Sequence, residues 1–544
     1  MKRKLFSYAL VCAMGIAGLL SSCTSKPSGA ALLPDDAMMV WSLDVKAAVE
    51  TSGIEGNERL TKELEKGVKQ IGMPRKIERK VLELIENPMD AGVDLAEPLF
   101  CAIVDMDNET FAFTGNLSDA EKFEEMVELV ASEVDSDARI RSVSRDSDIK
   151  YMQIEGDGLL LFSQDRFMLC NMERGEDEDD FVDEMAELFL QEEGYNTTSG
   201  YQKLMKEPGI IKMHLAFEEL LNTKEMKREM RNVPREAKET LRMLEDVDVI
   251  MALNIEDGEA TLVCEMDVTS EETKAMYEEL AAGLGDIEGR FLSYFDEDDV
   301  LVAAVNFDGE KYLDVFENRL KDLMEKLSKQ QRDMILDVIE SVNGDIAFGF
   351  GGEMLEGNEG PCVSLYGATS NDYIVNLVAN ENAGDDDLVK SGKNEWYMPI
   401  KDGEYTSTGE TYYDEYWGEW RPKYEWVYRE VGRATFGNRD NVSYFITSEK
   451  KPELFEEASS PVDKSDFVGK KLYARLSVPA ILQMDEVKEE LSSGDGYMVR
   501  KVLEEVELLE LVCENNYRVT LRLKTKDKSE TPVATLLDIL SELL

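Results

Sequence analysis

The feature that most constrains the fold of this chain is a repeated order of segments. Residues 211–221 (IKMHLAFEELL) align without gaps on residues 472–482 (LYARLSVPAIL), and both read as an alternating strand that runs into a helix. A chain of 544 residues is also too long for one hydrophobic core. The sequence therefore predicts two tandem homologous copies, at about 35–290 and 296–544.

Further segments keep the same order in both copies. Residues 247–268 and 507–525 each alternate on two arms around a polar turn, which is the signature of a hairpin. A strand, an N-capping residue and an amphipathic helix recur at 111–130 and 362–380. Because alternating strands indicate a sheet with one wet face, the predicted fold class is α+β. Each copy would be a mostly antiparallel sheet with helices packed on one face.

The N-terminal residues carry the pattern of a bacterial lipoprotein signal. Residues 2–4 are basic, residues 5–20 are apolar but short for a membrane span, and Leu20-Ser21-Ser22-Cys23 resembles a lipobox. We expect a signal peptide at 1–22, acylation of Cys23 and a polar tether over 23–34. Several acyl chains would anchor the protein firmly, because one chain alone holds weakly. A plain secretory signal with an incidental cysteine is the alternative.

Charge and cysteine usage exclude several classes of partner and site. With 60 basic and 114 acidic residues the formal net charge is −54, and such a field repels nucleic-acid phosphates. The chain is 43% hydrophobic with regular periodicity, so its acidity does not indicate disorder. The five cysteines that follow Cys23 show no zinc-ligand spacing. Their odd number and apolar surroundings favour buried free thiols over disulfides.

Four segments together resemble a known family. They are the lipobox, the opening LLPDDAMMVWSLDVKAAVETSGI (32–54), the strand GVDLAEPLFCAIVD (92–105) and the segment GNLSDAEKFEEMV (115–127). The chain resembles Bacteroidetes lipoproteins grouped as domain of unknown function 4836, over nearly all of its mature length. These motifs are structural, and the family carries no assigned activity. The resemblance therefore implies no functional residue beyond Cys23.

The residues of the chain do not assemble a recognisable catalytic or metal site. His214 is the single histidine, which excludes multi-histidine metal sites, and it is expected to be an exposed or helix-covered strand residue. The glycine-rich stretch 347–360 fails the dinucleotide-binding pattern because Met354 stands at the third glycine position. The acidic runs 176–180 and 385–387 lack the spacing of a calcium loop. No cofactor and no metal are predicted, and the residues favour a non-enzymatic protein.

An aromatic stretch supplies the candidate binding residues. Residues 401–422 are predicted to be an insertion in the second copy, where rings interleave with carboxylates. Such a surface suits sugar or protein recognition, whereas a hairpin whose rings pack across strands is the structural alternative. The ring-bearing residues on the following strand, 423–432, are expected to pack, and 433–438 and 442–449 to follow as separate strands. The candidate ligand-binding residues are Tyr412, Tyr413, Tyr416, Trp417 and Trp420.

The sequence thus predicts a non-enzymatic binding or envelope scaffold protein. It would be anchored in the outer membrane by its N-terminal lipid, and it would face the periplasm because no acidic run follows Cys23. Its expected partners are an envelope protein or a glycan, and no nucleic acid. The alternative is a carbohydrate-binding or carbohydrate-active protein that uses the aromatic insertion.

Overall fold

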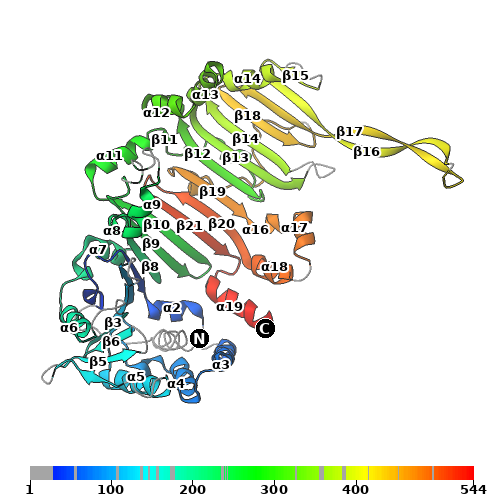
Figure 1. Ribbon diagram of the computed structural model, residues 1–544. Helices are drawn as coiled ribbons and strands as arrows, with labels where there is room; N and C mark the ends of the chain where they lie inside the picture. The colour runs from blue at the N-terminus through cyan, green and yellow to red at the C-terminus, as the bar shows by residue number, and fades with distance from the viewer. Residues whose placement is uncertain are drawn as a thin grey trace. The chain divides into compact units, whose positions relative to one another are not determined.

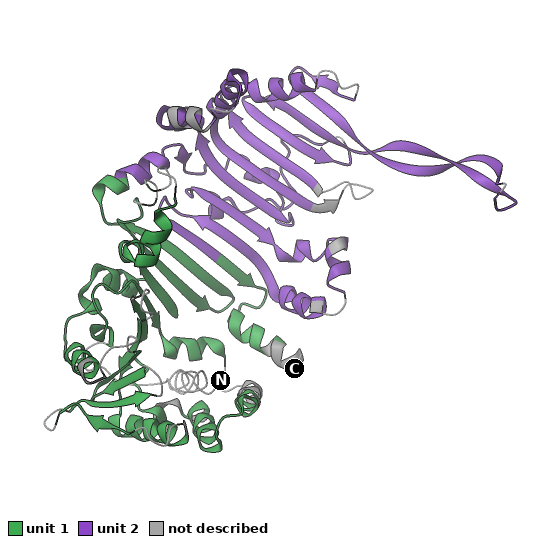
Figure 2. Cartoon of the chain, viewed as in Figure 1, with its two compact units in different colours: residues 1–274, 522–544 green, residues 275–521 purple. Residues whose placement is uncertain are grey.

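The structure is a computed structural model. It describes residues 29–53, 58–105, 110–134, 139–144, 148–154, 158–171, 178–233, 238, 241, 243–324, 327–354, 361–382, 387–414, 416–450, 452–492 and 495–543. The predicted signal peptide, Cys23 and most of the tether lie outside these residues. The chain divides into two units, residues 1–274 with 522–544 and residues 275–521 (Figure 2). Helices and antiparallel strands occur in both units, which confirms the α+β class. No helix within the described ranges is long and apolar enough to cross a membrane.

The first unit is built on one antiparallel sheet (Figure 1). Its strands are β1 Met39–Leu43, β2 Leu99–Asp105, β3 Thr110–Asn116, β4 Arg141–Ser142, β5 Lys150–Ile154, β6 Gly158–Phe162, β7 Arg166–Asn171, β8 Ile211–Ala216, β9 Val247–Glu256 and β10 Glu259–Val268. They pair in the order β4-β5-β6-β7-β3-β2-β1-β8-β9-β10. The predicted hairpin at 247–268 is β9 and β10, which turn at Gly258 with a φ of 76°.

Helices cover both faces of this sheet, and not one face as the sequence analysis predicted. Along β7, Phe167 and Leu169 join a core with residues of α5, whereas Met168 and Cys170 join a second core with residues of α6. Successive side chains of a strand point to opposite faces, so the two cores lie on opposite sides. Strands buried on both faces read as continuous apolar runs, and GLLLF and RFMLC are such runs.

The helices are α2 Val45–Ser52, α3 Glu58–Ile71, α4 Arg75–Glu86, α5 Ala120–Val134, α6 Glu178–Phe189, α7 Ser199–Lys206, α8 Phe217–Asn222, α9 Lys224–Met230, α11 Glu271–Leu280 (which continues into residues of the second unit) and α19 Pro532–Leu543.

The second unit is also built on antiparallel β-sheet. Its strands are β11 Leu284–Gly285, β12 Leu301–Asp308, β13 Val342–Met354, β14 Pro361–Thr369, β15 Val389–Gly392, β16 Glu395–Asp414, β17 Glu419–Arg439, β18 Val442–Ser448, β19 Leu472–Ser477 and β20 Val506–Cys513, and β21 Arg518–Thr525 contributes residues to both units. They pair in the order β15-β16-β17-β18-β14-β13-β12-β19-β20. The short β11 pairs with the far end of β12.

The core of the second unit lies on one face of this sheet. Alternate residues such as Val302, Ala347 and Tyr366 are buried there against segments 287–295 and 454–467. Gly349 makes the close approach possible, because a Cβ at this position would lie 2.6 Å from Cδ1 of Phe295. The helices of the unit are α12 Gly309–Leu323, α13 Lys329–Ser341, α14 Tyr373–Glu381, α15 Lys464–Phe467, α16 Val478–Ile481, α17 Asp485–Glu490 and α18 Asp495–Glu505.

The opposite face of the same sheet carries apolar side chains, whereas the sequence analysis predicted a solvent-exposed polar face. Phe348 lies across from Leu365, and Leu365 lies across from Phe445. The last two side chains are 37% and 38% exposed, so this face is only partly covered. Alternation shows which residues share a face of a sheet, but it does not show how much of that face other elements cover.

One expected turn is absent in the second unit. Residues 423–432 and 433–438, predicted as separate strands, form the single strand β17, and Arg433 pairs across β18 with Ser448 and across β16 with Pro399. The backbone stays extended through Gly432-Arg433, because this pair supplies no turn residue beyond one glycine.

Candidate functional site

Strands β16 and β17 continue far beyond the sheet as a two-stranded hairpin, which we call the ribbon and define as residues 401–430. The hairpin projects from the sheet (Figure 1). The last β17 residue with a partner on β18 is Arg433, which lies opposite Pro399, and the ribbon begins with Lys401 opposite Glu430. Among its described residues none is buried, on either face. The ribbon is also twisted, as isolated two-stranded sheets are.

Local sequence explains why the ribbon turns where it does. At the tip the Asp414 carboxylate accepts hydrogen bonds from the backbone N–H groups of Tyr416 at 3.0 Å and Trp417 at 3.2 Å. Gly418 closes the turn with a φ of 67°, which strongly favours glycine. A bulge between Ser407 and Thr411 gives β16 extra residues against β17.

The register of the ribbon sorts its side chains onto two different faces. Every second residue of β17 from Trp420 to Tyr428 shares one face, and each shares that face with its partner on β16. The opposite face carries mainly charged side chains, such as Glu419, Arg421 and Glu425. We call the first the aromatic face; its ring-bearing residues are Tyr405, Tyr413, Trp420, Pro422, Tyr424, Trp426 and Tyr428, and Gly403, Ser407 and Thr411 also lie on it.

All five sequence-predicted binding residues lie on the ribbon and are exposed. Tyr413 and Trp420 are on the aromatic face, Tyr412 is on the opposite face, and Tyr416 and Trp417 are at the tip. The exposed fractions are 49% for Tyr412, 52% for Tyr413, 87% for Tyr416, 63% for Trp417 and 69% for Trp420. The structural alternative describes them in part, because Tyr413 packs across the strands against Trp420, but the rings do not cover the sheet.

Three further rings belong to the same face and were expected to pack. Tyr424, Trp426 and Tyr428 are 56%, 47% and 66% exposed, so the prediction that they pack was wrong. Their strand has left the sheet, and no described element covers them. The sequence could not show this, because rings that alternate with charged residues along β17 are equally the pattern of a strand with one buried face.

The rings contact one another edge to face. The centroids of Tyr405 and Trp426 are 4.8 Å apart at an interplanar angle of 74°, and those of Tyr413 and Trp420 are 5.6 Å apart at 65°. Trp426 lies directly over Gly403, where a Cβ would be 2.3 Å from the indole. Such pairs contribute about 0.5–1.5 kcal/mol each beyond area burial. The ribbon therefore carries ordered rings whose faces are not coplanar.

The ribbon is acidic, and its ion pairs are exposed. Residues 401–430 include eight acidic and four basic residues. Lys423 contacts Glu410 at 3.3 Å and Arg421 contacts Glu419 at 3.0 Å, with all four side chains substantially exposed. Exposed pairs of this kind stabilise by about 0–1 kcal/mol. These ion pairs therefore contribute little to the stability of the ribbon. Because acidic residues outnumber basic ones, the net charge of the ribbon remains negative.

His214 is a helix-covered strand residue, one of the two positions that the sequence analysis allowed. It is 5% exposed and lies under α7, where a Cβ on Gly200 would be 2.3 Å from its ring. Its Nε2 atom is 3.5 Å from a carboxylate oxygen of Asp248, and the ring of Tyr195 packs beside it. Burial beneath a helix leaves no room for a substrate at this imidazole.

The remaining candidates form no site in the described part of the chain. There, no group of three or more His, Cys, Asp or Glu residues could hold a metal ion. Residues 176 and 177 of the first acidic run lie outside the described residues, and 178–180 begin α6. Asp387 of the second run pairs with Lys401 at 2.5 Å. Cys101, Cys170, Cys264, Cys362 and Cys513 are all free thiols.

Comparison with known proteins places the chain in a family. Residues 30–408 match the family described as a domain of unknown function, DUF4836. The chain belongs to the DUF4836 family. The family match ends inside the ribbon, so β17 and the tip lie beyond the matched residues of this DUF4836 protein. No curated protein matches the chain.

Two solved structures show a weak likeness. Crystal form IV of TP0453 is 10% identical with a TM-score of 0.25, and the match covers 44% of this chain and 81% of the other. Crystal form III of TP0453 is 9% identical with a TM-score of 0.26, and the match covers 48% of this chain and 90% of the other. Scores this low carry no argument about fold or function.

Proposed function

We propose that this DUF4836 protein is a lipid-anchored envelope protein that binds a protein partner through the aromatic face of its ribbon. The observation that carries the proposal is an ordered row of aromatic side chains held in solvent by a hairpin that no described element covers. Contiguous exposed apolar surface of this kind marks interaction sites in soluble proteins. No catalytic role is proposed.

The composition and geometry of the aromatic face favour a protein over a flat ligand. Tryptophan and tyrosine supply most of the binding energy at protein interfaces, where they enter pockets on the partner. Four pairs of neighbouring rings stand at 65–85° to each other, so none of these pairs offers the parallel faces on which a sugar chain could stack. The negative field of the ribbon further favours a partner whose apolar pocket has a basic rim.

The predicted lipobox supports anchoring at the envelope. Acylation of Cys23 would tether the protein to the outer membrane, on the periplasmic side, through the short polar segment that follows. This part of the proposal rests on sequence alone, since Cys23 lies outside the described residues.

We also propose that the chain arose by duplication, with the ribbon added to the second copy. In its support, the strand pairings of the two sheets follow the same order, strand for strand, from β4 and β15 to β9 and β20. His214 on β8 lies across from Val40, as Arg475 on β19 lies across from Val302. The hairpin of β5 and β6, short in the first sheet, corresponds to that of β16 and β17.

A face-resolved crosslinking experiment tests partner binding. The photoreactive residue p-benzoylphenylalanine would replace Trp420 or Tyr424 on the aromatic face, or Arg421 or Glu425 on the charged face, in cells that make the full chain. The two aromatic-face positions and the two charged-face positions alternate along one strand, so the charged-face pair is a matched control for the aromatic-face pair. We expect the same protein adduct from both aromatic-face positions and none from the charged-face positions.

Two results would contradict the proposal. Equal adducts from both faces, or no adduct from either, would show that the aromatic face has no specific protein partner. An adduct whose added mass is removed by glycosidases and resists proteases would identify a glycan instead, and would favour the carbohydrate-binding alternative.

A further inference from the structure

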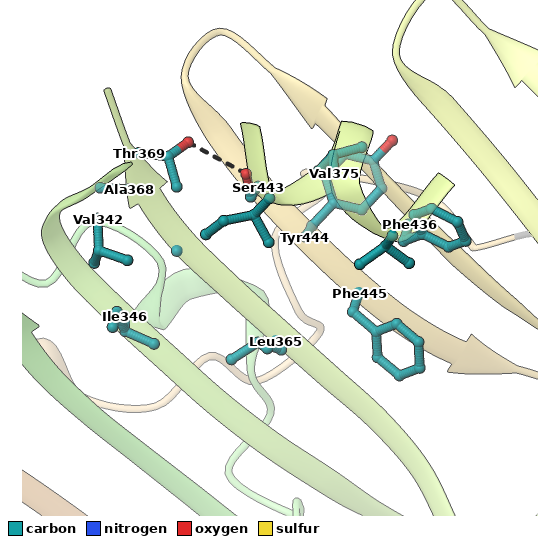
Figure 3. Close-up of a pocket in the computed structure, with 13 residues that line it drawn as sticks. Val342, Ile346, Leu365, Ala368, Thr369, Val375, Phe436, Ser443, Tyr444 and Phe445 are labelled. Carbon is teal, nitrogen blue, oxygen red and sulfur yellow. Dashed lines mark hydrogen bonds between the residues drawn. The ribbon is translucent and has the colours of Figure 1, made fainter. Parts of the chain in front are cut away.

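A cavity lies between the sheet of the second unit and helix α14, away from the ribbon's aromatic face. Its volume is about 340 Å³, and β13, β14, β17, β18 and α14 all contribute to its wall (Figure 3). The wall is formed by aliphatic and aromatic side chains such as Ile346, Val375 and Phe436. Protein interiors seldom leave voids much larger than a water molecule, so a space of this size is not an ordinary packing defect.

Gly367 creates part of this space. It lies in the interior of β14 and lines the cavity, and a Cβ built on it would meet just one atom, Cγ1 of Ile346, at 4.0 Å. A glycine inside a strand weakens the strand and often marks a place where a ligand comes close. A larger residue would fit here without backbone strain, because the φ of Gly367 is outside the left-handed region.

The wall has one small polar patch, and that patch is uncharged. The hydroxyl oxygens of Thr369 and Ser443 are 3.2 Å apart (Figure 3). The side-chain amide nitrogen of Asn438 donates to each at 3.0 Å. Every residue that lines the cavity is uncharged. An apolar cavity of about 150 Å³ stays dry and binds benzene, so a larger one of the same character is suited to a hydrocarbon.

The cavity has an apolar rim open to solvent. Leu365, Val378 and Phe445 line it and are 37%, 39% and 38% exposed. A ligand could therefore enter along the uncovered apolar face of the sheet. Small-molecule sites are typically clefts of about 300–1,000 Å³ with mostly apolar walls and a few placed polar groups, and this cavity meets both conditions.

We propose that this cavity binds a single aliphatic chain that ends in an uncharged polar group, such as an alcohol. The hydrocarbon would fill the space left by Gly367, and the head group would exchange hydrogen bonds with the hydroxyls of Thr369 and Ser443. A carboxylate head is disfavoured, because the wall offers no cation and the chain carries a net charge of −54. The site is independent of the ribbon.

Calorimetric titration with 1-decanol and with decanoate at pH 8 tests the inference on the full chain. We expect the unmodified protein to bind 1-decanol at least tenfold more tightly than decanoate. Gly367→Leu fills the cavity and should weaken 1-decanol binding at least tenfold while leaving the melting temperature unchanged or higher. Ala303→Leu, on the same sheet face but outside the cavity wall, is the matched control and should bind as the unmodified protein does.

A second variant distinguishes loss of the binding site from a folding defect in Gly367→Leu. Val378→Trp changes a half-exposed helix position at the rim, so it should fold and should also weaken 1-decanol binding at least tenfold. No binding of 1-decanol to the unmodified protein, or equal binding to the folded Gly367→Leu and Val378→Trp variants, would overturn the assignment. Equal affinity for decanoate would overturn the uncharged head group.

Discussion

At the scale of single residues, the ribbon's rings are supported by neighbouring side chains and not by a core. Trp417 lies under the guanidinium of Arg421 at 5.1 Å, and Trp420 meets Tyr413 edge to face. The sequence could identify these residues as candidates, because rings and carboxylates interleave there. It could not fix their exposure, which depends on whether another element covers them.

Replacing the exposed tryptophans should barely change stability. Trp417→Ala and Trp420→Ala each remove a cross-strand or cation–π contact, and should lower the free energy of unfolding by about 0–1 kcal/mol. Phe467→Ala, which empties a fully buried site against Tyr473, should cost about 3–5 kcal/mol. Urea unfolding of the three variants measures this, and a loss above 3 kcal/mol in either tryptophan variant would show a buried ring.

Asp299 gives the stability of the second unit a pH dependence. Burial raises the pKa of its carboxyl to about 6 from the ordinary 3.8, so between these values the folded state holds a proton that the unfolded state releases. Stability due to this group is therefore present near pH 4 and lost as the pH rises through 6. Asp299→Asn stays neutral, and relative to the unmodified protein should gain about 1–2 kcal/mol between pH 4 and 7. A difference that is flat with pH would contradict the buried carboxyl.

At the scale of elements, alternation and turn residues predicted where strands lie. They did not predict which faces of the sheet other elements cover. The hairpin at 247–268 follows from its polar turn and appears as β9 and β10. The helices on both faces of the first sheet, and the union of two predicted strands into β17, were missed. Both outcomes depend on tertiary neighbours, which local patterns do not encode.

The ribbon should be separable from the rest of the fold. No described residue of 402–429 is buried, the two strands of the ribbon pair with each other, and Lys401 and Glu430 already lie opposite each other. Replacing 402–429 with Asn-Gly would close the strands through a two-residue hairpin turn. The melting temperature should stay within a few degrees of the full chain's by calorimetry. A large loss of melting temperature would mean that the ribbon stabilises the sheet.

At the scale of the whole molecule, the repeated order of segments was readable from the sequence, whereas the compact units were not. Residues 522–544 cluster with the first unit, where the carbonyl of Glu530 accepts a hydrogen bond from the N–H of Gly258 at 2.8 Å. Such long-range contacts have no local signature. The DUF4836 match covers 30–408 and stops before most of the ribbon.

Anchoring is also a property of the whole molecule. Cys23→Ala should remove the acylation site and release the protein from the membrane fraction, because the acyl chains are the proposed anchor. Immunoblots of membrane and soluble fractions measure this, with Cys101→Ala as a control that leaves the lipobox intact. Retention of Cys23→Ala in membranes, or a mature N-terminus other than acylated Cys23, would contradict the lipid anchor.

Hydroxyl-radical footprinting, read by mass spectrometry on purified protein and on intact cells, tests the central claim most directly. In purified protein Trp417, Trp420 and Trp426 should be labelled faster than the half-buried Trp41 and Trp396. In cells the aromatic face should be protected, while Tyr412 on the opposite face should label as before. Equal labelling of Trp420 and Trp426 in both samples would mean that nothing covers the aromatic face, and would contradict partner binding through the ribbon.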